Sequence, residues 1–251
     1  MDKFFTNINV AKQCIDTVNL SNFDFVIEPS AGSGNFLNQI NHPNKIGIDI
    51  DPSAKGIVKQ DFLTYYPPNY DNILTIGNPP FGKGGPHLAI KFFNHAAKFS
   101  KTIAFIIPKS FRKSFVQNKL DRYFHLTHDN DIPIDSFEPP TITKCCFQIW
   151  TKLDIIRPLI VLPTNCFDFD LMDNSDNCDF VIKKTGAGVG KIFETHLHKY
   201  KSRRWFYIKS KIDKQLLIEK FRKLDFSIAK QTALQETIRP GELIQLYSNI
   251  Q

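Results

Sequence analysis

Short apolar runs alternate with amphipathic stretches from residue 24 to about residue 152. This alternation is typical of a parallel β-sheet whose strands are joined by crossover helices. In the longest amphipathic stretch, a proline stands in the first turn and apolar side chains recur at helical spacing. We therefore predict strands at 24–28, 45–50, 72–77, 102–107, 124–129 and 145–151, and helices at 34–40, 86–99 and 110–121.

The pattern changes after Lys152. Residues 153–180 are rich in Asp, Asn and Pro, whereas 180–193 and 203–210 predict strands around a glycine loop. Helices are expected at about 213–224 and from Pro240 onward. The sequence thus predicts an α/β protein with two parts: a catalytic domain with a mostly parallel sheet at 1–152, and a small α+β module at 153–251 that is a candidate for substrate binding.

The composition, with 42% hydrophobic and 23% charged residues, is that of an ordinary globular protein. No apolar run is long enough to span a bilayer, and the first residues lack the apolar block of a signal peptide. We expect a protein of the cytoplasm or nucleus that is not secreted and has no membrane partner. Its five cysteines include no C-x-x-C pair, so neither disulfides nor a bound metal is expected, and Cys145 and Cys146 are interpreted as buried thiols.

A net charge of +7 and a pI near 9.1 favour a polyanionic partner. The cations gather in two stretches, 109–122 and 183–211. Either stretch can instead be a solvated face, and charge alone does not decide between the two. As candidate substrate contacts we select Lys109, Arg112, Lys199, Arg203 and Arg204.

A glycine turn follows the first predicted strand, in residues 28–37 (EPSAGSGNFL). Gly32 and Gly34 allow the backbone to turn sharply and approach a ligand closely. The third glycine of a dinucleotide-binding turn is missing, and Glu28 ends the strand. A carboxylate there suits a cationic ligand such as S-adenosylmethionine, with its sulfonium and amino groups, and repels a pyrophosphate.

Carboxylates also follow the second predicted strand, in residues 47–52 (GIDIDP). Asp49 is positioned to accept hydrogen bonds from ribose hydroxyls, and Asp51 is expected to cap the next helix. Further along, Asp61 can accept from an adenine amino group while Phe62 packs on the ring. Taken alone, Asp61 is better interpreted as an ordinary turn residue.

The third motif is in residues 77–82 (GNPPFG), at the end of the strand predicted at 72–77. Two consecutive prolines fix the backbone and remove two N–H donors. The side-chain oxygen of Asn78 and a neighbouring carbonyl can accept both protons of an NH2 group, and Phe81 can stack on the ring that carries it. In isolation such a segment is a proline turn; after a strand and a glycine turn, it indicates an amine-binding site.

These motifs resemble the amino-methyltransferases of nucleic acids, which carry an N/D-P-P-Y/F motif on a class I methyltransferase, Rossmann-like fold. Their order is similar to that of the gamma-class adenine-N6 methyltransferases, with residues 4–12 in the place of the N-terminal cofactor segment. The resemblance covers roughly residues 1–152. It implies a methyl transfer from S-adenosylmethionine to N6 of adenine in nucleic acid, with DNA favoured and RNA allowed.

The resemblance also implies roles for individual residues. The target amine would be bound by Asn78 and Pro79 in the N-P-P-F loop, which includes Pro80, with Phe81, and less specifically Phe137, stacked on the target base. The cofactor would be bound by Thr6, Glu28, Pro29, Ala31, Gly32, Gly34, Asp49, Ile50, Asp61 and Phe62.

Two alternatives stay open. Protein-glutamine methyltransferases grip an amide with a similar loop, but they carry a helical domain before the glycine turn. The second alternative is a catalytically silent subunit that binds nucleic acid.

Residues 77–83 and 185–191 resemble P-loops but lack the required Ser/Thr, so an ATP site is not expected. We interpret 205–207 (WFY) as packing residues.

Overall fold

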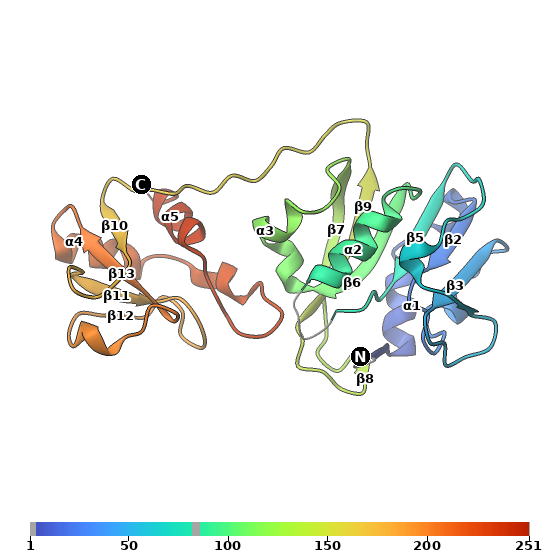
Figure 1. The fold of residues 1–251 in the computed structure, drawn as a ribbon, viewed down its shortest axis with the longest axis horizontal. Coiled ribbons are helices and arrows are strands. Elements are labelled where there is room, and N and C mark those ends of the chain that lie inside the picture. Colours follow the sequence, from blue (N-terminus) through green and yellow to red (C-terminus); the bar gives the residue numbers. More distant parts are fainter. Residues whose placement is uncertain (1–3, 82–85, 251) are drawn as a thin grey trace. The chain divides into compact units, whose positions relative to one another are not determined.

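The computed structural model describes residues 4–81 and 86–250. The chain divides after Ile160 into two compact units (Figure 1). The boundary predicted from the sequence, at residue 152, therefore lies eight residues before the division seen in the structure.

The first unit contains a seven-stranded sheet of order β4-β3-β2-β5-β6-β9-β7. Neighbouring strands from β4 to β6 are parallel, and β9 is antiparallel to both β6 and β7. The predicted mostly parallel sheet is therefore confirmed. Its strands are β2 (Phe25–Glu28), β3 (Lys45–Asp49), β4 (Val58–Lys59), β5 (Ile73–Gly77), β6 (Thr102–Pro108), β7 (Phe124–Ile132) and β9 (Cys145–Lys152).

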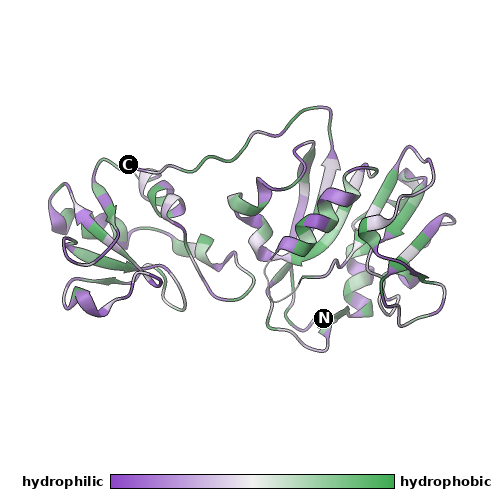
Figure 2. Ribbon diagram, in the orientation of Figure 1, coloured by the Kyte–Doolittle hydropathy of each residue, from purple (hydrophilic) through white to green (hydrophobic). Residues whose placement is uncertain are grey.

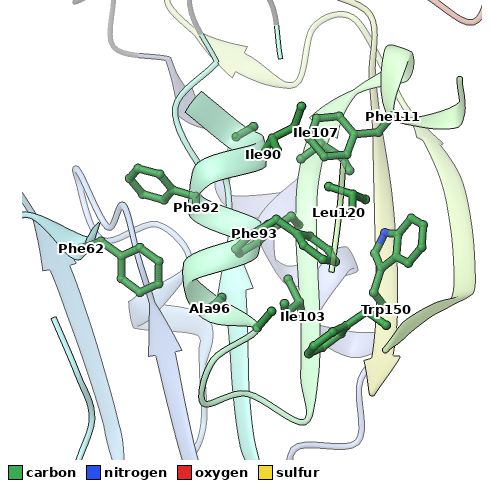
Figure 3. Packing of buried hydrophobic residues seen from close by; sticks show 14 of the residues in the cluster. Phe62, Ile90, Phe92, Phe93, Ala96, Ile103, Ile107, Phe111, Leu120 and Trp150 are labelled. Atoms are coloured by element: carbon green, nitrogen blue, oxygen red, sulfur yellow. The ribbon is translucent and has the colours of Figure 1, made fainter. Parts of the chain in front are cut away.

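Alternate residues of the central strands point to two different cores. On one face, Ile103, Phe105 and Ile107 of β6 pack in a cluster with α2 (His87–Ala96). Figure 3 shows Ile103 and Ile107 in this cluster. On the other face, Ala104 and Ile106 pack in a cluster with α1 (Ile8–Asp16). The central strands β2, β5 and β6 are buried on both faces, which explains why they are nearly continuous apolar runs. Figure 2 shows that α2, by contrast, carries both hydrophobic and hydrophilic residues.

Two of the predicted helices are wrong in extent. Residues 34–40 contain only a 3-10 turn, η2 (Leu37–Gln39), because Gly34 has a positive φ of 80° at the start of the segment. Residues 110–121 divide into η4 (Lys109–Arg112) and α3 (Ser114–Gln117), because Lys113 is extended between them. Serine and asparagine in this segment favour such local turns over a continuous helix.

The second unit is an α+β module with a four-stranded antiparallel sheet of order β10-β13-β11-β12. One face of the sheet packs against two helices, and the shared core includes Phe180, Ile182, Phe206 and Ile208. Asp213 caps the first helix by accepting a hydrogen bond from the Leu216 N–H. The elements are β10 (Phe169–Met172), β11 (Phe180–Lys183), β12 (Ile192–Phe193), η5 (Leu197–Lys199), β13 (Trp205–Ser210), α4 (Lys214–Arg222), η6 (Phe226–Lys230) and α5 (Pro240–Ser248).

Among the described residues, no helix has the length and apolar character needed to cross a membrane. Cys145 and Cys146 are buried, as predicted, with 1% and 0% of their surfaces exposed. Burial raises the pKa of Cys145 to about 12, so this thiol stays protonated at neutral pH.

Candidate active site

A cavity of about 330 Å³ lies where β2, β3 and β5 end. This is the edge at which α/β sheets commonly bind ligands, and the volume is in the range of small-molecule sites. Thirteen predicted site residues line it: Thr6, Glu28, Pro29, Ala31, Gly32, Asp49, Ile50, Asp61, Phe62, Asn78, Pro79, Pro80 and Phe81. The predicted residues Gly34 and Phe137 do not line the cavity.

The glycine turn after β2 depends on Gly32. Its φ of 48° is rarely adopted by other residues, and an added Cβ would lie 2.8 Å from Cε1 of Phe5. The Gly32 N–H donates to Oδ2 of Asp49 at 2.8 Å, which ties the turn to the end of β3. Gly34 also has a positive φ, and its N–H donates to the Ala31 carbonyl. Gly34 therefore shapes the turn from outside the cavity.

Asp49 is held from both sides, and only 9% of its surface is exposed. Besides the bond from Gly32, Oδ1 accepts a hydrogen bond from the Asp51 N–H at 2.8 Å. A carboxylate offers about four acceptor positions, so two bonds leave capacity for the hydroxyls of a ligand. The prediction that Asp51 caps a helix is wrong, because residues 50–57 form a loop without a helix.

Glu28 is the last residue of β2, and only 2% of its surface is exposed. Its Oε2 has no hydrogen-bond partner among the described residues. Burial raises the pKa of Glu28 well above its usual value, and nearby Asp49 raises it further, while a backbone hydrogen bond from Leu37 and the charge of Lys45 lower it. A buried carboxylate without a partner is costly, so the site favours a cationic group next to Oε2.

The N-terminal segment is fastened across the cavity by two asparagine side chains. Asn35 Nδ2 donates to the Thr6 carbonyl at 2.7 Å, and Asn78 Nδ2 donates to the Phe4 carbonyl at 3.1 Å. The strand β1 (Phe5–Thr6) also pairs with β8 (Phe137–Glu138). Sequence reasoning missed Asn35, although its position directly after the glycine turn was a usable signal.

The orientation of Asn78 leaves its acceptor available. Because Nδ2 donates to Phe4, Oδ1 is the atom left over, and it is buried without a partner in the described part of the chain. Thr6 Oγ1 is buried and unpartnered there in the same way. Pro79 and Pro80 line the cavity beside Asn78 and bring no N–H donors. Gly82, the last residue of the motif, lies outside the described residues.

Phe137 does not occupy the position expected of a second base-stacking ring. It is 2% exposed, and its ring meets the half-buried Phe81 edge to face, with the centroids 6.2 Å apart. The pairing of β8 with β1 holds Phe137 inside the core. It supports Phe81 in this structure and presents no open face to a base.

Asp61 and Phe62 form another wall of the cavity. Oδ1 of Asp61 accepts from the Leu63 N–H at 2.9 Å and so caps the 3-10 turn η3 (Phe62–Thr64). Phe62 is 2% exposed and packs against Phe92 of α2, with the ring centroids 5.2 Å apart (Figure 3). Its ring is therefore held rigidly at the boundary between core and cavity.

The two groups of predicted substrate contacts differ in their partners. Arg112 forms ion pairs with Asp129 and Asp131, and Lys109 pairs with Asp131. The hydrogen bonds to Asp129 raise the pKa of Arg112 above its usual value. These two cations are thus already neutralised by carboxylates within the fold. Lys199, Arg203 and Arg204 are exposed in the second unit, and no described carboxylate pairs with them.

In the sheet of the first unit, the antiparallel strand β9 lies between β6 and the edge strand β7. This strand order is that of the class I methyltransferase fold. No family model matches the sequence. The type II methyltransferase M.HincII of Haemophilus influenzae is 33% identical over 88 residues, which are 32% of this chain and 17% of that protein. The chain therefore matches about a sixth of that relative's length.

Solved methyltransferase structures with low sequence identity resemble this fold. The EcoKI M protein of a type I restriction enzyme has 16% identity and a TM-score of 0.45, covering 60% of this chain and 44% of that one. The 23S rRNA methyltransferase ErmE has 16% identity and a TM-score of 0.43, covering 63% of this chain and 72% of that one.

Proposed function

We propose that this protein transfers a methyl group from S-adenosylmethionine to the exocyclic N6 amine of adenine in a nucleic acid. The observation that carries the proposal is the set of buried acceptors in one cavity, namely Glu28 Oε2, the Asp49 carboxylate and Asn78 Oδ1. Thr6 Oγ1 joins them as a hydroxyl that can donate or accept. Such groups are costly to bury alone and suit a ligand that supplies both positive charge and N–H or O–H donors.

The residues present fit S-adenosylmethionine. Glu28 would hold a cationic group of its methionine end, and Thr6 would hydrogen-bond to the same end. Asp49 would accept from the ribose hydroxyls, while Asp61 and Phe62 would contact the adenine. Bound S-adenosylmethionine supplies a methyl group on a positively charged sulfur.

The N-P-P-F loop would activate the target amine. The lone pair of an adenine N6 atom is delocalised into the ring, which makes the amine a poor nucleophile. Asn78 Oδ1 and the Pro79 carbonyl would accept its two N–H bonds and favour a pyramidal nitrogen. Positioned by Asn78 and Pro79, the nitrogen would accept the methyl group that S-adenosylmethionine supplies, with the electron pair of the S–C bond left on sulfur and a proton released from the amine to solvent. Orientation of this kind contributes up to about 7–11 kcal/mol.

No cysteine is among the described residues that line the cavity, which supports direct transfer without a covalent enzyme intermediate. In a duplex, the target base would have to be flipped out of the stack, at a cost of a few kcal/mol. A stacking contact with Phe81 would return about 1–3 kcal/mol of this cost.

The test is a transfer assay with radiolabelled S-adenosylmethionine and separate pools of unmethylated DNA, RNA and protein. DNA is the first substrate to examine. Label in nucleic acid supports the proposal, and a strong loss of label in Asn78→Ala reactions assigns the transfer to this site. Label in protein glutamine would identify a protein methyltransferase. Nucleic-acid binding without turnover or cofactor affinity would identify a silent subunit.

A further inference from the structure

The sheet of the second unit has a second face, opposite to the one that packs on α4 and α5. Cross-strand partners share a face, so Phe193, Val181 and Tyr207 lie together, and Lys183 lies beside Trp205. Tyr200, from the segment that precedes β13, joins this face. Its ring centroid is 4.6 Å from that of Trp205 and 5.1 Å from that of Phe193.

This aromatic cluster of Phe193, Tyr200 and Trp205 is held in place but remains accessible. Phe193 on β12 and Trp205 on β13 lie on the two sides of β11, with their ring centroids 5.3 Å apart. The Tyr207 hydroxyl donates to the Tyr200 carbonyl, which anchors the preceding segment to the sheet. Phe193 is 40% exposed, and Tyr200 and Trp205 are half-buried. Phe206 and Tyr207 are buried, as expected of packing residues, whereas Trp205 is not.

The segment that carries Tyr200 and Trp205 has charges of one sign. Residues 195–211 contain no Asp or Glu. Four exposed cations from this segment have no carboxylate partner among the described residues: Lys199, Lys201, Arg203 and Arg204. Lys183 adds a fifth cation, with Nζ 6.0 Å from the centre of the Trp205 ring. Several cations elsewhere in the unit do form ion pairs, as in Lys209 with Asp179 and Lys214 with Glu194.

We propose that this aromatic–basic face, formed by the aromatic cluster and the four unpaired cations, binds the unpaired nucleotides of a nucleic-acid strand. Cations track the phosphates, and aromatic rings stack on bases whose faces are open. A base-paired duplex offers the phosphates but hides the faces of its bases, so it engages only part of this surface. This inference rests on the proposed function. With a nucleic acid as the substrate of methyl transfer, the aromatic–basic face makes one with a single-stranded segment the preferred substrate.

The test measures binding by the full chain and is independent of methyl transfer. The probes are a fluorescently labelled oligothymidylate and a blunt DNA duplex of equal length, followed by fluorescence anisotropy. We expect the single strand to bind at least about tenfold more tightly, which is the scale of one lost stacking contact. Equal affinity for both probes would overturn the proposal.

Two variants locate the binding. Tyr200→Ala and Trp205→Ala should each weaken binding of the single strand about tenfold and leave duplex affinity nearly unchanged. The matched control is Phe167→Ala, since Phe167 is an aromatic residue of the same unit that is 97% exposed outside the cluster. Unchanged affinity in both cluster variants would contradict the assignment, as would an equal loss in the control.

A third variant guards against misfolding. Trp205→Phe keeps an aromatic ring, so it should keep most of the affinity while losing the quenching of tryptophan fluorescence by the single strand. Trp150, the other tryptophan, is 1% exposed and cannot stack on a base. Quenching that persists in Trp205→Phe would place the strand elsewhere. Because binding of oligothymidylate requires neither S-adenosylmethionine nor a target adenine, failure of the methyl-transfer assay and failure of this inference are distinguishable.

Discussion

The two units carry opposite kinds of polar surface. In the first unit, the cavity presents buried acceptors such as Glu28 Oε2 and Asn78 Oδ1 that have no partner among the described residues. In the second unit, the aromatic–basic face presents exposed cations and half-buried rings. Buried unpartnered atoms require a small ligand of defined geometry, whereas exposed cations suit a long polyanion. Under the two proposals, methyl transfer and the tracking of the nucleic acid belong to different parts of the chain.

The largest effect is expected from Asn78→Ala. Removing the only side-chain acceptor of the N-P-P-F loop should lower kcat by about 10²–10³, as when one transition-state hydrogen bond is lost. The affinity for S-adenosylhomocysteine should change less than about threefold, because Asn78 addresses the target base. Turnover assays and calorimetry measure the two effects. Asn22→Ala, at an exposed asparagine, is the control; wild-type turnover in Asn78→Ala would disprove its role.

Asp49→Ala should have the reverse profile. Loss of this acceptor leaves the ribose hydroxyls unpaired and also frees the Gly32 and Asp51 N–H groups that it holds. We expect the dissociation constant of S-adenosylhomocysteine, measured by calorimetry, to rise at least about tenfold. Asp16→Ala, an exposed carboxylate paired with Lys12, should bind normally. An unchanged constant in Asp49→Ala would show that the ribose binds elsewhere.

How far the site follows from the sequence differs between its parts. Glu28, Asp49 and Asn78 were predictable because each directly follows an apolar run, and the ends of parallel strands meet at one edge. The burial of Phe137 was not predictable, because it depends on the pairing of β8 with a strand more than 100 residues earlier. The ion pairs of Lys109 depend likewise on Asp131 of β7.

The same limit applies to the fold. The positions of the central strands follow from local apolar runs, which the burial of these strands on both faces imposes. The extent of helices depends on details such as the positive φ of Gly34 and the extended backbone of Lys113. Asn35 illustrates a third case, since its contact with the Thr6 carbonyl joins two segments that only the fold brings together.

A smaller effect is expected from the exposed cations of the second unit, whose loss should lower the affinity for nucleic acid without changing the methylation reaction. Replacing Lys199, Arg203 and Arg204 together by Ala should weaken binding of all nucleic-acid sequences alike and flatten the dependence of log affinity on log salt. The methylated base should stay the same. The control removes an equal charge from three ion-paired lysines, Lys209, Lys211 and Lys214. Identical slopes in the wild type and the first triple variant would remove this unit from the binding site.

The smallest effect concerns pH and Glu28. Because burial raises the pKa of Glu28 in the folded state, this state holds the proton more tightly than the unfolded chain does. The free energy of unfolding without ligand should therefore fall as pH rises from the usual Glu pKa toward the raised value, by about 1.4 kcal/mol for each pH unit in that window. Glu28→Gln should lack this fall in urea titrations. A wild-type slope in that variant would assign the pH dependence to another group.

The most direct test of the central claim is nucleoside analysis by mass spectrometry after the purified protein has reacted with unmethylated DNA and RNA and S-adenosylmethionine. We expect N6-methyladenine in the products of the wild type and at least about a hundredfold less in those of Asn78→Ala, although the variant still binds the cofactor. Methylation of a ring carbon, or N6-methyladenine formed equally by Asn78→Ala, would contradict the assignment of this cavity as the site of amine methylation.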